Sequence, residues 1–173
     1  MPTSLYDLSV ANYLQTIPAM SGVLEKGLAH CKEKGIDLGS IVVTKLADDM
    51  LPFSFQIVAV AHHAVGTIEA LKSGQFGPPR PPESLDYAAL QKLLSDAEAA
   101  LRKLTRSEVE ALAGRDVAFK LRGQAIPFTA ENFVLSFSLP NFYFHATTAY
   151  DILRTKGVPL GKRDFLGSIR IKT

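Results

Sequence analysis

The sequence contains one cysteine, Cys31, and no tryptophan among its 173 residues. A single thiol cannot form an intramolecular disulfide, so we expect a fold without disulfide support and a reducing compartment. The first ten residues contain no basic segment followed by an apolar run, so they give no indication of a secretory signal. These observations predict a cytoplasmic protein.

Long apolar runs and an excess of one charge are also missing. The longest apolar run, Ile57–Ala61, is far shorter than the roughly 20 residues that cross a bilayer. The formal net charge is only +2, from 19 Lys and Arg against 17 Asp and Glu. The richest basic cluster, Lys162-Arg163, is followed at once by Asp164. Because nucleic-acid binding requires a clustered basic face, we expect neither nucleic acid nor membrane as a partner.

Helical periodicity dominates what is present. Hydrophobic residues make up 47% of the chain and charged residues 21%, a balance typical of one globular domain over residues 1–173. Apolar residues recur at three- and four-residue steps in four long segments, which predicts four amphipathic helices. These helices are expected over about 4–34, 51–74, 84–104 and 129–157. The pattern predicts an all-α fold, a four-helix bundle, with a bend at Pro18 in the first helix.

The segments between these helices predict short elements. Ser107 and Glu110 fit a capping box for a brief helix. Val117–Leu121 alternates apolar and polar residues, and a turn at Arg122-Gly123 leads into 124–128, so we expect a small β-hairpin before the last helix. A two-stranded hairpin is marginal alone, so it should lie against the helices.

Two further segments are expected to be irregular. The run Gly77–Pro82 contains four prolines, which predicts a stiff, extended link. The tail, residues 160–173, is expected to be extended and loosely packed.

Few residues could carry chemistry. The sequence contains no nucleophile elbow, phosphate-binding glycine loop, dinucleotide fingerprint or CxxC pair, which leaves the histidines. His145 lies in the most aromatic stretch of the chain, and Asn141 precedes it by one turn on the same helix face. Pro140 leaves the carbonyl of Ser136 without its helical partner. This pattern predicts a polar pocket, or alternatively a core histidine that is hydrogen-bonded to a neighbouring helix.

His62 and His63 lie midway along the second predicted helix. Relative to the apolar stripe, His63 lies nearer the core, on the side that it shares with Gln56, and His62 lies nearer solvent. Histidines from two antiparallel helices could meet and bind a divalent metal. Zinc normally takes three protein ligands, and Asp49 or Asp48 is a candidate to complete the set.

Several motifs resemble those of a known superfamily. The most specific are Pro-Asn-Phe-x-Phe-His at 140–145, the following run to Pro159, and Gly-Lys-Arg-Asp-Phe-Leu-Gly at 161–167. Ser-Leu-Tyr-Asp at 4–7 and Asp49-Met50 before Pro52 also match. Over nearly its whole length the chain resembles the DinB/YfiT-like superfamily, and more narrowly an uncharacterised family of DinB-like domains of unknown function.

The resemblance implies a helical bundle and a candidate metal site. In the metal-binding branch, one ligand comes from the second helix and two come from an HxxxH pair on the last. The second of that pair matches His145, whereas the first falls on Asn141, which departs from the pattern. The ligand from the second helix would be His62 or His63. The superfamily includes thiol-dependent transferases, isomerases and hydrolases.

Two hypotheses follow. The first is a small-molecule enzyme of hydrolase, isomerase or transferase type, with a pocket between the second and fourth helices. His145 and Asn141 would be catalytic, and a zinc, nickel or manganese ion would bind His62, His63 and His145. Other residues expected to contact the ligand are His63, Gln56, Tyr13 and Asp49. The alternative is a non-catalytic bundle that binds a ligand or dimerises through Phe142 and Tyr143. We expect a homodimer.

Overall fold

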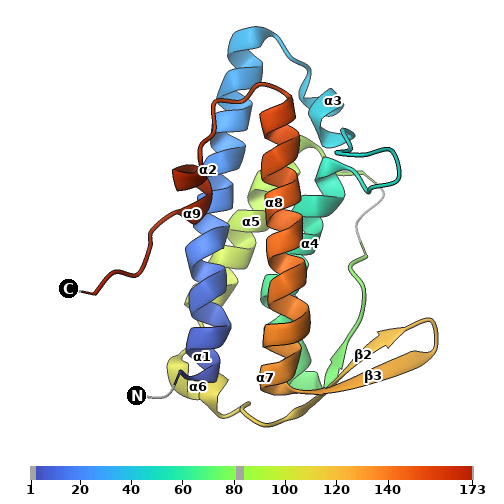
Figure 1. The fold of residues 1–173 in the computed structure, drawn as a ribbon, viewed down its shortest axis with the longest axis vertical. Helices are drawn as coiled ribbons and strands as arrows, with labels where there is room; N and C mark the ends of the chain where they lie inside the picture. Colours follow the sequence, from blue (N-terminus) through green and yellow to red (C-terminus); the bar gives the residue numbers. More distant parts are fainter. Residues whose placement is uncertain (1–2, 81–83, 173) are drawn as a thin grey trace.

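The computed structural model describes residues 3–80 and 84–172 and is mostly helical, as predicted (Figure 1). Its long helices are α2 (Val10–Lys34), α4 (Phe53–Ser73), α5 (Tyr87–Arg102) and α8 (Leu139–Thr155). Among the helices, the most extensive packing joins α4 to α8, α2 to α5, and α4 to α5. Within the described ranges, no helix has the length and apolar character needed to span a bilayer.

The core lies between these long helices and follows the predicted stripes. On α5, the buried positions Tyr87, Leu90, Leu94, Ala97 and Leu101 repeat at three- and four-residue steps. Asp86 accepts a hydrogen bond from the Ala89 amide, so α5 begins there rather than near Ser84.

The first predicted helix is divided in two. A short helix, α1 (Leu5–Leu8), ends at Ser9, whose backbone is not helical (φ −111°, ψ −85°), and α2 follows. The buried Ser9 hydroxyl donates to the Leu5 carbonyl (2.6 Å), which stabilises the break. Apolar spacing did not predict this break, because the stripe continues across it. Pro18 lies within α2.

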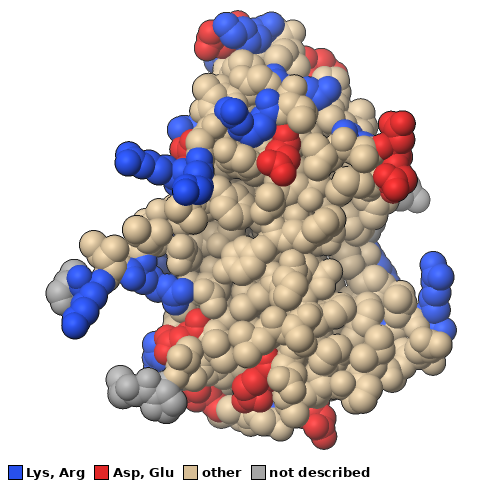
Figure 2. All heavy atoms as spheres, in the orientation of Figure 1, with Lys and Arg blue, Asp and Glu red and all other residues tan. Residues whose placement is uncertain are grey.

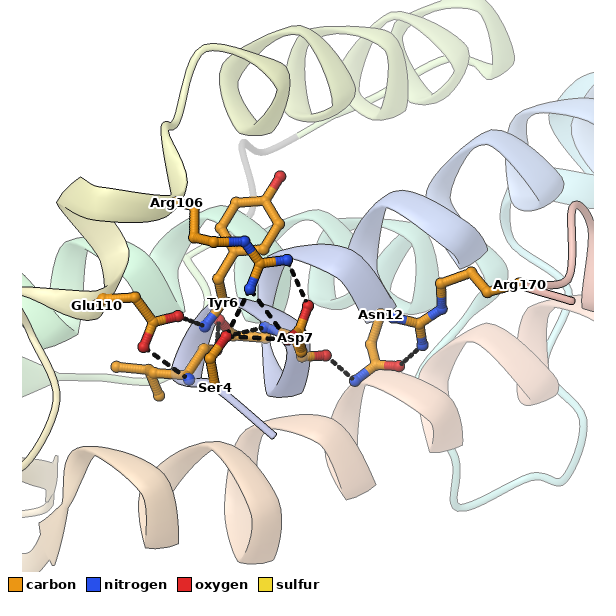
Figure 3. Close-up of polar contacts among 9 residues, drawn as sticks. Ser4, Tyr6, Asp7, Asn12, Arg106, Glu110 and Arg170 are labelled. Carbon is orange, nitrogen blue, oxygen red and sulfur yellow. Dashed lines mark hydrogen bonds and ion pairs between the residues drawn. The ribbon is translucent and has the colours of Figure 1, made fainter. Parts of the chain in front are cut away.

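Contacts with α6 (Arg106–Glu110) hold α1 in place (Figure 3). The Glu110 carboxylate accepts hydrogen bonds from the backbone N–H groups of Leu5 (3.2 Å) and Tyr6 (2.9 Å). Arg106 forms two hydrogen bonds to the Asp7 carboxylate, at 3.0 and 2.7 Å. This pairing holds the pKa of Asp7 well below its usual range.

The predicted capping box was therefore assigned to the wrong residues. Thr105 and Glu108 form the box at the start of α6. Glu110 instead binds the start of α1, which is distant in sequence.

A small three-stranded sheet lies against one end of the long helices (Figure 1). The predicted hairpin is confirmed as β2 (Asp116–Leu121) and β3 (Gln124–Thr129), with Arg122 and Gly123 at positive φ in the turn. A third strand, β1 (Gln75–Phe76), pairs in parallel with β2, with Phe76 opposite Phe119. The strand β1 was not predicted, because a two-residue strand has no periodicity.

The remaining short helices refine the predicted bundle. They are α3 (Leu38–Val42), α7 (Ala130–Phe133), the π-helix η1 (Val134–Ser138) and α9 (Lys162–Leu166). The helix α9 packs on α2 and corrects the expectation of a fully extended tail (Figure 1). In the proline-rich link, Gly77–Arg80 forms no helix or strand, while Pro81 and Pro82 lie outside the described residues. The predicted four-helix bundle thus describes only part of the fold.

Candidate functional site

The π-helix η1 sets the geometry at the start of α8. The N–H of Leu139 bonds to the carbonyl of Val134, five residues back, immediately before Pro140, which has no N–H to donate. The wider turn accommodates the proline within a continuous helical path. The last residue of η1, the buried Ser138, lies just before α8, and its hydroxyl contacts side chains of α2 and α4.

His145 is held by Gln56 from the facing helix. The Nδ1 atom of His145 lies 2.7 Å from Oε1 of Gln56, and Nε2 of Gln56 donates to the Leu51 carbonyl at 2.8 Å. The second bond fixes the amide, so its oxygen faces the imidazole and can only accept. His145 therefore carries a proton on Nδ1, and in the neutral ring Nε2 has an unprotonated lone pair.

His63 lies directly beside His145. The two rings stack with centroids 6.0 Å apart and an interplanar angle of 20°. His63 is only 4% exposed, and its Nδ1 has no hydrogen-bond partner among the described residues. Burying a polar nitrogen without a hydrogen-bond partner costs free energy of folding, and such nitrogens are typical of sites that bind a polar group.

Both imidazoles are held neutral. Burial, together with the neighbouring His62 and His145 rings, lowers the pKa of His63 to about 3. Burial also lowers the pKa of His145 to about 4. At neutral pH the pair therefore presents lone pairs and N–H groups rather than positive charge.

His62 faces a different part of the molecule. Its Nε2 lies 2.8 Å from the Gly77 carbonyl, and its ring packs 4.7 Å from that of Phe76. It is partly exposed, whereas His63 is buried. Of the two alternatives, His63 is thus the histidine that lies beside His145.

A buried chain of hydroxyl groups lies next to His63. The Tyr13 hydroxyl is 2.9 Å from that of Ser138, which also contacts Thr67 and donates to the His63 carbonyl at 3.1 Å. Burial raises the pKa of Tyr13 to about 12. Tyr13, predicted to contact a ligand, is fully buried in this chain. Ser138 and Thr67 were not predicted, although the nearby Pro140 marked the region.

Two other predicted residues do not join the site. The side-chain amide of Asn141 donates to the Phe137 carbonyl on its own helical segment (2.7 Å), so Gln56 rather than Asn141 is the hydrogen-bond partner of His145. Asp49 is exposed, in the loop between α3 and α4. The rings of Phe55 and Phe144 instead pack beside His145, with centroids 5.8 and 5.3 Å from the centroid of its imidazole.

The residues present do not fit the implied metal site. In the described part of the chain, no group of three or more His, Cys, Asp or Glu side chains is arranged to hold a metal ion. The His62 Nε2 is engaged by the Gly77 carbonyl, whereas the bond from His145 Nδ1 to Gln56 leaves only Nε2 of that ring as a possible ligand. Asn141 stands where the resemblance implies the third histidine, and its amide nitrogen is already bonded.

The fold defines a helical protein of DinB-like type. A solved structure described as a DinB family member protein from Shewanella denitrificans superposes with a TM-score of 0.85 at 25% sequence identity. The match covers 98% of this chain and 95% of that one. The similarity therefore extends over the sheet and the short helices as well as the long ones.

A family model identifies the particular group. Residues 5–166 match the family described as Domain of unknown function (DUF1993), and the chain belongs to it. No curated protein matches the sequence.

Proposed function

We propose that this protein is a small-molecule enzyme in which Nε2 of His145 accepts a proton from the substrate. The observation that carries the proposal is the 2.7 Å contact between His145 Nδ1 and Gln56 Oε1, with Gln56 anchored to the Leu51 carbonyl. This arrangement supplies a base in one tautomer and one orientation, between the aromatic rings of Phe55 and Phe144.

The low basicity of His145 favours isomerisation over hydrolysis or group transfer. An imidazole whose pKa is about 4 is a weak base, but its protonated form is a strong acid. A proton taken from a substrate carbon is thus readily released again, either to the same substrate or to solvent. We infer a reaction that moves a proton within one small molecule, and the hydroxyl chain of Tyr13, Ser138 and Thr67 supports the helices around it.

Chemical modification tests the state of His145. Diethyl pyrocarbonate acylates neutral imidazoles, and peptide mass spectrometry measures each histidine separately. A solvated histidine becomes about tenfold less neutral between pH 7.5 and 5.5, whereas His145 should react at nearly the same rate after correction for reagent decay. A tenfold slowing at His145 would contradict the proposal.

Deuterium exchange tests the reaction itself. Small carbonyl compounds are incubated with the protein in D₂O, and incorporation at the carbon next to the carbonyl is followed by NMR. We expect exchange that is lost in His145→Gln and retained in His30→Gln, a control on α2. Equal exchange by wild type and His145→Gln would exclude His145 as the base.

Metal content is a separate measurement. Tag-free wild type and His145→Ala are compared by plasma mass spectrometry, before and after exposure to zinc, nickel or manganese. We expect no stoichiometric metal, because the ligand set is incomplete. A near-stoichiometric metal that disappears in His145→Ala would replace this proposal with metal-assisted chemistry.

A second candidate is a homodimer through α8. Tyr143 and Phe144 are 36% and 56% exposed, whereas Phe142, which was predicted to form this surface with Tyr143, is buried. The molecular face that carries α8 in Figure 2 is largely uncharged. A second copy on this face would bury the two exposed rings and close the site around His145. Light scattering should then show a dimer for wild type and a monomer for Phe144→Lys. A monomeric wild type would exclude it.

A further inference from the structure

A cavity of about 600 Å³ lies between α4 and α5, outside the site around His145. Its walls are mainly apolar and include Val58, Ala61 and Val65 on α4, with Leu93 and Ala97 on α5. This volume is within the range of pockets that hold small organic molecules. We propose that the cavity binds a small aromatic carboxylic acid that carries a hydrogen-bond donor, such as a phenolic hydroxyl.

His62 supplies the acceptor for that donor. The Gly77 carbonyl can only accept, so Nε2 of His62 carries the proton and donates to it (2.8 Å). In the neutral ring, Nδ1 has a lone pair and makes no hydrogen bond to a described residue. Burial lowers the pKa of the His62 imidazole, which keeps this lone pair available at neutral pH.

Gly66 keeps the acceptor accessible from the cavity. His62 and Gly66 both line it, and a Cβ atom at position 66 would lie 3.4 Å from Nδ1 and 3.2 Å from Phe76. The absence of a side chain there leaves room beside Nδ1. A hydroxyl group that enters between α4 and α5 can therefore reach the imidazole.

The charged lining residues favour an anion. Lys92 pairs with Asp96 one turn away on α5 (2.6 Å), so these two charges offset each other. Arg80 also lines the cavity and forms no ion pair with a described residue. Its guanidinium matches a carboxylate, while the apolar walls match an aromatic ring.

The experiment compares three ligands on wild-type protein by ¹H–¹⁵N NMR titration. They are 3-(4-hydroxyphenyl)propanoate, 3-phenylpropanoate, which lacks the donor, and tyramine, which carries the opposite charge. The hydroxyaryl acid should give saturable shifts in amides of α4 and α5 near the cavity. Loss of one hydrogen bond predicts about tenfold weaker binding for 3-phenylpropanoate. Tyramine should bind weakest.

Variants identify the two polar contacts. His62→Leu should remove the preference for the hydroxyl group, and Arg80→Gln should weaken both acids severalfold. Lys120→Gln, the same charge change on the exposed face of β2, should bind like wild type. Three results would each overturn the proposal: no saturable shifts, equal binding of the two acids to wild type, or equal effects of Arg80→Gln and Lys120→Gln. All three are independent of His145.

Discussion

Acidification should destabilise this protein between pH 7 and pH 5, because the buried His63 and the half-buried His145 are held in their neutral form. The ordinary histidine pKa is 6.5, whereas in the folded protein the pKa is about 3 for His63 and about 4 for His145. Protons therefore bind the unfolded chain more readily than the folded one. Stability is fully present above pH 6.5 and is lost as the pH falls toward the folded pKa values.

The magnitude follows from the pH interval. From 6.5 to 5 is about 1.5 pH units, and each unit corresponds to about 1.4 kcal/mol per histidine. Each of the two histidines therefore lowers the free energy of unfolding by about 2 kcal/mol at pH 5, a large share of the 5–15 kcal/mol typical of a domain. The pKa of His62 is also lowered, so it acts in the same direction.

The assay is urea unfolding at pH 7 and pH 5 for wild type and two variants. His63→Phe keeps an aromatic ring in the buried position but cannot titrate, so it should lose about half of the pH dependence. His30→Phe, on α2 and outside the site, should retain all of it. The carboxylates with lowered pKa values, such as Asp7 and Glu110, lose their contribution at lower pH and do not obscure this window. A wild-type change below about 1 kcal/mol, or an unchanged slope in His63→Phe, would refute the reasoning.

Three further predictions concern the packing and the site. Gly167→Ala should destabilise more than Gly35→Ala: both glycines have positive φ, but a Cβ at 167 would lie 2.9 Å from α2, whereas nothing lies within 4 Å at 35. Gly35→Ala should cost about 1–2 kcal/mol from backbone strain alone, and hydrogen exchange should show α9 released only in Gly167→Ala. Ser138→Ala should cost about 1–3 kcal/mol in urea unfolding, because it leaves the buried Tyr13 hydroxyl without its partner, whereas Thr67 still donates to the His63 carbonyl; a neutral result would contradict the hydroxyl chain. Gln56→Leu should change the ¹⁵N tautomer signature of His145, and an unchanged spectrum would show that Gln56 does not set the tautomer.

The sequence predicted well whatever depends on local repetition. The buried stripe of α5 and the hairpin at Arg122-Gly123 follow from the helical period and from turn chemistry. The break at Ser9 and the strand β1 were missed because each depends on partners elsewhere in the fold or spans too few residues to repeat. The capping role assigned to Glu110 was wrong for the same reason: its partners are 104 and 105 residues away.

The candidate site likewise contains features that the sequence predicted and contacts that only the structure established. The sequence by itself marked His145, Gln56 and the pair of adjacent histidines on one helix, because polar residues stand out against an apolar stripe. Only the tertiary structure decided that His63 stacks on His145 and that Gln56, not Asn141, bonds to it. Helical spacing determines which side chains share a face. The rotation of α4 against α8, which depends on all the packed side chains between them, determines which of those side chains meet.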